Sequence, residues 1–269
     1  MIRSEAAEPS SRFRLFIKWL MYPGTNWASR DKSAFTQTLL TGSPDKPLQT
    51  LDCGCGNAYY TFEAFRRGST CVGITIHAWE RDHCLEMRDY LGIPADRVEF
   101  KAVRLADFSA DSAQQGRFDQ VIFLDVIEHI RDDGAALRQL HRVMADDGFI
   151  FVATPDRDWQ DIVTGGRVTR HEDGWHVRNG YTFEQLERVL DENGFEPVDR
   201  LRYGTLGSSV VEWLQHRVFR RYNDILTVLL LPLLVGIGWL LSPWKRTRTI
   251  FVIARKRPLG ADESAVSAH

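Results

Sequence analysis

Short apolar runs alternate with helix-forming segments along most of the chain, and this alternation limits the possible folds more than any other feature. Runs rich in Val, Ile, Leu and Phe predict strands at 49–52, 71–76, 98–103, 119–124 and 148–153. Segments with helical periodicity predict helices at 58–67, 79–91, 133–144 and 182–193. Strands that are separated by helices form right-handed crossovers and a mostly parallel sheet. The chain is therefore expected to be an α/β protein with a doubly wound sheet.

Composition argues against several other classes. Lys and Arg number 34 against 36 Asp and Glu, so the formal net charge is −2, whereas a chain that mainly binds nucleic acid is usually basic. The cysteines, which are Cys53, Cys55, Cys71 and Cys84, show no paired CxxC spacing. Neither a zinc site nor a disulfide framework is therefore expected, and no nucleic acid is expected among the partners.

The first 46 residues are predicted to form a helical segment ahead of the sheet. Residues 1–12 are polar and are expected to be disordered, and helices are expected at 13–22 and 33–40. The first of these helices contains Arg14 and Lys18 and is followed by no small-residue cleavage site. It is therefore interpreted as an amphipathic helix of the mature protein and not as a signal peptide.

The turn after the first predicted strand carries the strongest signal for a binding site. Asp52 ends this strand, and Gly54 and Gly56 lie in the turn before the next helix. Glycine lets the backbone approach a ligand closely, and the N-terminus of a helix offers unpaired N–H groups. In such sheets ligands bind at the carboxyl ends of the strands. A ligand is therefore expected at this turn, with a purely structural tight turn as the alternative.

Several stretches of the sequence together resemble the class I S-adenosylmethionine (SAM) methyltransferases. They are LDCGCGNAYYTF, FDQVIFLDVIEHI, HRVMADDGFIFVATP and GYTFEQLERVLDENGF. The resemblance extends over about residues 49–200 and implies a Rossmann-like sheet of seven strands that binds SAM as cofactor. It implies that Asp52, Gly54 and Gly56 surround the amino-acid part of SAM. It also implies that Asp125 and Val126, at the neighbouring strand end, bind the cofactor.

The sequence departs from the usual pattern of this family at three positions. Ala58 stands where the third glycine is usual, and Thr75 replaces the acid that normally holds the ribose hydroxyls. Arg104 occupies a position where an acid near the adenine is common. Leu105 is then left to pack against the adenine ring.

The end of the second predicted strand resembles a variant found in cyclopropane fatty-acid synthases and some small-molecule methyltransferases. In that variant the strand ends in threonine, and a glutamine one helical turn later approaches the nucleoside. Glu80 holds the later position here. Thr75, Ile76 and Glu80 are therefore expected beside the nucleoside, with Glu80 as a ligand of the ribose or adenine. The alternative for Glu80 is a solvated carboxylate in the first turn of a helix.

His129, His176 and Tyr181 are the candidates for catalysis. His129 follows Glu128 just after the fourth strand, and an imidazole there can take a proton from a hydroxyl at neutral pH. A structural or SAM-packing role is the alternative for His129. His171, His176 and Tyr181 lie in a Gly-rich segment that is placed to cover the substrate, with an exposed loop of incidental histidines as the alternative. These residues show no metal-ligand spacing, so no metal is expected.

An uncharged apolar run extends from Ile225 to Leu241. Its length is at the lower limit for crossing a bilayer. The segment at 249–255 is expected to be the last strand of the sheet, so both ends of the run belong to one domain and a single crossing is excluded. Three interpretations remain open: a re-entrant or in-plane membrane contact, which the basic flanks suit, a lid over an apolar substrate, and a dimer face.

The whole sequence is interpreted as a SAM-dependent methyltransferase, cytoplasmic and peripheral at the membrane if the apolar run contacts lipid. The expected acceptor is a small apolar or lipid-linked molecule, methylated preferentially on oxygen. The alternatives are a cyclopropane-synthase-like enzyme that acts on acyl chains and a SAM-binding subunit without activity. The expected domains are an N-terminal helical segment (1–46), a SAM-binding core (47–204), an apolar helical insertion (205–247), the last strand (248–258) and a disordered tail (259–269).

Overall fold

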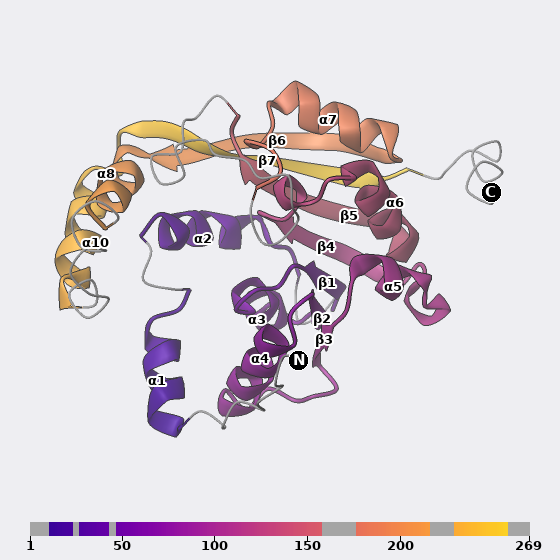
Figure 1. Cartoon of the computed structure of the whole chain (residues 1–269), viewed down its shortest axis with the longest axis horizontal. Helices are drawn as coiled ribbons and strands as arrows, with labels where there is room; N and C mark the ends of the chain where they lie inside the picture. Colours follow the sequence, from indigo (N-terminus) through magenta and orange to yellow (C-terminus); the bar gives the residue numbers. More distant parts are fainter. Residues whose placement is uncertain (1–10, 24–26, 43–46, 158–175, 216–228, 258–269) are drawn as a thin grey trace, which may run out of the picture.

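The computed structural model shows a single seven-stranded sheet with helices on both faces (Figure 1). It describes residues 11–23, 27–42, 47–157, 176–215 and 229–257. The expectations for residues 1–10, for His171, for the start of the apolar run at 225–228 and for the tail at 259–269 lie outside the described residues.

The predicted strands and helices lie close to observed ones, whereas the strand at 195–205 and the helix at 105–110 were not predicted. The strands are β1 (Gln49–Cys53), β2 (Thr70–Thr75), β3 (Val98–Ala102), β4 (Phe118–Leu124), β5 (Met144–Pro155), β6 (Phe195–Thr205) and β7 (Lys245–Lys256). The helices are α1 (Arg12–Leu20), α2 (Trp27–Leu39), α3 (Tyr59–Arg66), α4 (Ala78–Tyr90), α5 (Leu105–Ala110), α6 (Asp133–Val143), α7 (Phe183–Glu192), α8 (Leu206–Leu214) and α10 (Leu231–Leu240). Short 3-10 helices form η1 (Ser112–Gln114) and η2 (Ile127–His129).

The order of the strands across the sheet is β3-β2-β1-β4-β5-β7-β6. The strands from β1 to β5 pair in parallel, and β7 is antiparallel to both β5 and β6. The prediction of a mostly parallel, doubly wound sheet is thus confirmed. Because the chain reverses its direction of winding between β1 and β4, a crevice opens at the carboxyl ends of these two strands.

Side chains of the central strands alternate between two buried clusters. In β4, Val121 and Phe123 belong to one cluster, while Ile122 and Leu124 belong to the other. The first cluster also contains side chains from α5, α6 and α7, and the second contains side chains from α1, α3 and α4. Both faces of the sheet are therefore covered, which explains why its strands read as nearly continuous apolar runs.

The segment between β6 and β7 forms a helical layer at one end of the molecule. The long strands β6 and β7 reach past the other strands toward α8 and α10 (Figure 1). A Cβ atom at Gly207 of α8 would lie 2.2 Å from the carbonyl oxygen of Gly238 in α10, so a bare glycine allows this close packing. No helix in the described part of the chain is long and apolar enough to cross a membrane.

Candidate active site

A cavity of about 480 Å³ lies at the carboxyl ends of the parallel strands. Its walls come from the segments that follow β1, β2, β3 and β4 and from the first turns of α6. The sequence-predicted residues in its lining are Gly54, Gly56, Thr75, Ile76, Glu80, Leu105, Asp125, Val126 and His129. The fold thus gathers these predicted residues around one space, and the volume suits a small-molecule ligand.

The glycine turn after β1 has a backbone that favours glycine. Gly54 and Gly56 have φ angles of +83° and +51°. A Cβ atom at Gly54 would lie 2.4 Å from Cγ2 of Val126, whereas a Cβ at Gly56 would meet only the Gly54 carbonyl oxygen, at 4.0 Å. The amide nitrogens of Gly54 and Cys55 donate to the carbonyl oxygen of Ile74, at 2.9 and 3.0 Å, which fixes the turn against β2.

Asp52 lies behind this turn and does not line the cavity. Its carboxylate is buried and accepts a hydrogen bond from the Thr61 hydroxyl at 2.6 Å. Burial raises the pKa of Asp52 to about 6, although the hydrogen bonds from Thr61 oppose this shift. The side chain therefore holds the start of α3 against β1.

The end of β2 brings a carboxylate to the cavity. The Thr75 hydroxyl donates a hydrogen bond to the Glu80 carboxylate, and both residues line the cavity with Ile76. Glu80 lies in the first turn of α4, one turn beyond the strand end. On the other side, Arg104 and Leu105 contribute to the wall where α5 begins.

Asp125 follows β4 with a φ angle of +55°, a conformation that is uncommon for a residue with a side chain. Its carboxylate forms an ion pair with Lys32 of α2, 93 residues earlier in the chain. Burial is the largest single influence and lowers the pKa of Lys32, but the charge and hydrogen bond of Asp125, together with the charges of Tyr60 and Glu128, raise that pKa above its ordinary value. Sequence reasoning missed Lys32, because no local pattern links α2 to the end of β4.

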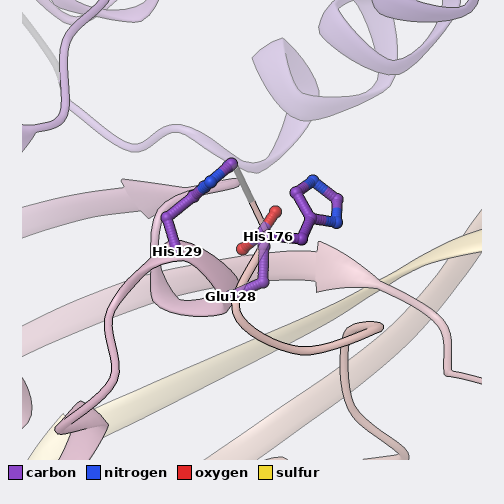
Figure 2. Close-up of side chains that lie close together, drawn as sticks. All are labelled: Glu128, His129 and His176. Carbon is purple, nitrogen blue, oxygen red and sulfur yellow. The ribbon is translucent and has the colours of Figure 1, made fainter. Parts of the chain in front are cut away.

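Glu128 and His129 in η2 meet His176, which comes from the segment after β5 (Figure 2). The Glu128 side chain is buried, and burial, followed by the charge of Asp125, raises its pKa to about 8. The imidazole rings of His129 and His176 pack edge to face with their centroids 4.7 Å apart. The structure therefore brings together two of the three candidates for catalysis.

Tyr181, the third candidate, lies apart from this cluster. Its hydroxyl donates a hydrogen bond to Asp133, and Arg178 bonds to the same two groups. Burial and the bond to Asp133 raise the pKa of Tyr181 above its ordinary value. Tyr181 belongs to a second hollow, bordered by α6 and α7, and is not among the residues that line the cavity.

Comparison with known proteins identifies the family. The model of a methyltransferase-domain family matches residues 26–200, which is more than half of the chain. The chain belongs to the class I SAM-dependent methyltransferase family. It is similar to the ubiquinone biosynthesis O-methyltransferase of Azorhizobium caulinodans, at 31% identity over 57% of this chain and 60% of the relative. It is also similar to the mitochondrial enzyme of that name from Bos taurus, at 25% identity over 59% of this chain and 45% of the relative.

This methyltransferase spans about half the length of the curated relatives that it matches. Among solved structures, it is similar to the geranyl diphosphate C-methyltransferase from Streptomyces coelicolor in complex with S-adenosyl-L-homocysteine. The TM-score is 0.59 at 14% identity, and the match covers 95% of this chain and 89% of the other. At this identity the likeness shows the shared fold.

The residues of the cavity fit SAM as the cofactor. The bare backbone at Gly54 and Gly56 allows the close approach of the amino-acid part, Glu80 presents carboxylate oxygens for hydroxyl groups, and Leu105 gives an apolar wall. When it is bound, SAM supplies a methyl group that its sulfonium makes electrophilic.

Proposed function

We propose that this methyltransferase acts on a hydroxyl oxygen of a small apolar acceptor, which binds on the His129 side of the cavity. The proposal is carried by the polar cluster of Glu128, His129 and His176, which lies beside the apolar cavity-lining residues Val126 and Ile130. It is supported by the names of the matched relatives, which are O-methyltransferases.

The polar cluster matters because oxygen acceptors differ from other acceptors in their need for proton removal. A hydroxyl is a poor nucleophile until it loses its proton, whereas a carboxylate is already ionised at neutral pH. His129 lines the cavity, and His176 and Glu128 lie directly behind it. These three side chains are the group in the described structure that is placed to take up a hydroxyl proton.

Lys32 supports the same assignment through charge. Its ammonium group neutralises Asp125, whose side chain lines the cavity next to the cluster. Without this ion pair, the Asp125 carboxylate would repel an acceptor oxygen that develops negative charge. Lys32 therefore makes this wall of the cavity compatible with an ionising hydroxyl.

An apolar acceptor is supported by two helices that expose large apolar side chains. These are Phe13, Phe16, Trp19 and Leu20 on α1, and Leu233, Trp239 and Leu240 on α10. Both helices lie at the end of the molecule that is on the left of Figure 1. Arg14 and Lys18 lie on α1 itself, and Lys245 follows α10 in the chain. Apolar helices with basic residues suit an in-plane contact with anionic lipid, where a lipid-linked acceptor would reside.

The lid and dimer interpretations of the apolar run give different expectations. No residue of α10 is among those that line the cavity, so contact with lipid is favoured over a lid. Exposed apolar surface of this kind is also found at subunit interfaces. A dimer is therefore the competing explanation for α10, and the experiment on membrane contact includes it as an outcome.

The reaction is tested with the purified full chain, SAM and a panel of apolar compounds that differ only in the acceptor group. The compounds carry a phenolic hydroxyl, an amine or a carboxylic acid on the same apolar scaffold. We expect S-adenosyl-L-homocysteine release with the hydroxyl compound, and a product whose fragmentation in mass spectrometry places the methyl group on oxygen. Transfer to the amine alone, or to carbon, would contradict the proposal.

Membrane contact is tested by flotation with vesicles of anionic phospholipid and with vesicles of neutral phospholipid. Leu233 and Leu240 are 60% and 65% exposed, so replacing both with Asp removes surface contact, whereas Leu234, at 1%, belongs to the packing of α10. The variant should lose binding to the anionic vesicles, while the control Val198→Asp, at an exposed site on β6, should retain it. A dimer in size-exclusion chromatography that the double variant splits, without vesicle binding, would assign α10 to a subunit interface instead.

A further inference from the structure

Glu128, His129 and His176 have the donor atoms of a metal site. One nitrogen from each imidazole and one oxygen from the carboxylate lie within 4.8 Å of one another. Figure 2 shows the Glu128 carboxylate between the two imidazole rings. This arrangement could not be predicted from the sequence, because His176 follows another strand and no ligand spacing connects it to Glu128 and His129.

The backbone fixes this meeting of two segments. The amide nitrogen of Val177 donates a hydrogen bond to the carbonyl oxygen of Glu128 at 2.9 Å. The residue after His176 is therefore tied to the residue before His129. This backbone bond holds the His176 residue beside η2, where its imidazole packs against the His129 ring. The closeness of the three side chains therefore depends on the backbone as well as on the side-chain rotamers.

The Glu128 carboxylate is buried without a hydrogen-bond partner among the described residues. Its side chain is 1% exposed, and neither carboxylate oxygen has a hydrogen-bond partner in the part of the chain that the structure describes. Nδ1 of His129 is also buried there without a partner. Buried polar groups without partners are rare in folded proteins, because they lose their hydration and gain nothing in return. A bound cation would satisfy both groups at once.

We infer that Glu128, His129 and His176 bind one divalent transition-metal ion of the Zn²⁺ class. Two imidazoles and a carboxylate match the preference of Zn²⁺ and Co²⁺, whereas Mg²⁺ and Ca²⁺ favour sets of oxygen ligands. Ligand bonds of about 2.0–2.1 Å would separate the donor atoms by roughly 3.4 Å, so the side chains would close around the ion by small rotations.

Three protein ligands leave a coordination position open, as in catalytic zinc sites. Because His129 also lines the cavity, an ion that it binds would lie beside the region where the proposed function places the acceptor. An ion there would bind the acceptor hydroxyl and lower its pKa, so that the proton can leave to solvent water. In that metal-bound state the imidazoles act as ligands, and they serve as proton acceptors only in the metal-free protein. This role rests on the proposed function, but the existence of the metal site does not.

The test begins with the full chain freed of metal by dialysis against EDTA. We expect calorimetry to show one equivalent of Zn²⁺ bound. CoCl₂ should give the visible absorption bands of Co²⁺ at a low coordination number. MgCl₂ should displace neither Zn²⁺ nor Co²⁺. The variants Glu128→Gln and His176→Ala should each bind Zn²⁺ at least tenfold more weakly. His83→Ala is the matched control, since His83 lies on α4 near Lys18, and it should bind as the wild type does.

Titration with SAM on the same samples reports whether each variant is folded. The inference is overturned if the wild type binds no Zn²⁺, or if Glu128→Gln and His176→Ala bind SAM and retain full affinity for Zn²⁺. Methyl transfer to a hydroxyl by a protein that binds no metal would contradict only the proposed metal site. Metal binding without methyl transfer to any hydroxyl would contradict the proposed function and support the metal site.

Discussion

The part of the cavity that we propose holds SAM, called the cofactor half, and the part that we propose holds the acceptor, called the acceptor half, are built in different ways. In the cofactor half, the glycine turn and the Thr75–Glu80 pair each lie within a few residues of one strand end. In the acceptor half, Asp125 pairs with Lys32 of α2, and His129 packs against His176 from beyond β5. The first half therefore depends on local backbone shape, and the second depends on contacts between distant segments. Each half should fail separately when its own residues are changed.

The two halves also differ in the hydrogen bonding of their buried carboxylates. Asp52, behind the cofactor half, accepts a hydrogen bond from Thr61. Glu128, in the acceptor half, has no such partner among the described residues, and its pKa is raised to about 8 against about 6 for Asp52. A carboxylate with a partner is part of the scaffold, whereas one without a partner is available to a ligand.

The largest effect is expected from a change in the acceptor half that leaves cofactor binding in place. His129→Gln keeps a polar side chain of similar size but cannot take the proton or act as an imidazole ligand. We expect kcat for hydroxyl methylation to fall by about a thousandfold, within the range typical of a lost acid–base group. Steady-state kinetics and a SAM titration measure the two quantities on the same sample.

The SAM titration decides whether the two halves are separate. The dissociation constant for SAM should change by no more than about threefold, roughly 0.7 kcal/mol. A parallel loss of SAM binding would show that His129 serves the cofactor, which is the packing role that the sequence left open. His83→Ala, outside the cavity, should change neither quantity.

The second effect concerns the two glycines of the cofactor half, which the structure makes unequal. A Cβ at Gly54 would collide with Val126, and its φ of +83° adds strain, whereas Gly56 has room for a Cβ. Gly54→Ala should raise the dissociation constant for SAM by about a hundredfold, roughly 2.7 kcal/mol. Gly56→Ala should raise it by about tenfold or less, because only the left-handed backbone opposes the substitution.

Calorimetric titration of both variants, with circular dichroism as the check on folding, measures this difference. Equal effects at the two positions would mean that the collision with Val126 is relieved by a small movement of that side chain. A Gly54→Ala variant with wild-type affinity would contradict the assignment of this turn to SAM.

This division explains how much of the molecule the sequence could predict. The parallel strands were predictable because both faces of the sheet are buried and their apolar runs are nearly continuous. The edge strand β6 was not, because its side chains are mostly exposed and Pro197 interrupts the pattern. Its position is set by pairing with β7, a contact that leaves no local signal.

The same reasoning applies to the site. The cofactor half was predictable because a glycine turn and the helix that follows it are neighbours in sequence. Lys32 and the contact of His176 with His129 were not, because each pairing forms only when the chain has folded. Tyr181 was a candidate for catalysis because its loop was predicted to cover the substrate, but its hydroxyl bonds with Asp133 and it does not line the cavity.

A smaller effect is expected at Glu80, the acidic residue of the cofactor half. Glu80→Ala removes a hydrogen-bond acceptor for a hydroxyl of SAM and should raise the dissociation constant by about fivefold to tenfold, or about 1–1.5 kcal/mol. Glu80→Gln keeps one acceptor oxygen and should have a smaller effect. Asp82→Ala, an exposed position on the same helix, is the matched control. If Glu80→Ala behaves like Asp82→Ala, Glu80 is a solvated carboxylate and not a ligand.

The smallest effect is expected at Ala58, where the family pattern has a third glycine. Ala58 has a φ of +63°, which disfavours alanine by about 1–2 kcal/mol relative to glycine. Glycine, however, loses more conformational entropy on folding, by about 0.5–1 kcal/mol. The Ala58 side chain is also fully buried, so its loss removes about 0.8 kcal/mol of apolar burial.

These contributions nearly cancel, so Ala58→Gly should change the free energy of unfolding by less than about 0.5 kcal/mol. Urea unfolding followed by circular dichroism measures this quantity, and the affinity for SAM should also stay unchanged. Ala58→Val, which forces a β-branched residue into the same backbone conformation, should destabilise the fold clearly. A gain of more than about 1 kcal/mol in Ala58→Gly would show that backbone strain dominates at this position. Alanine in place of the third glycine would then destabilise the cofactor half. If the free energy of unfolding stays unchanged, this half accommodates alanine at that position without loss of stability.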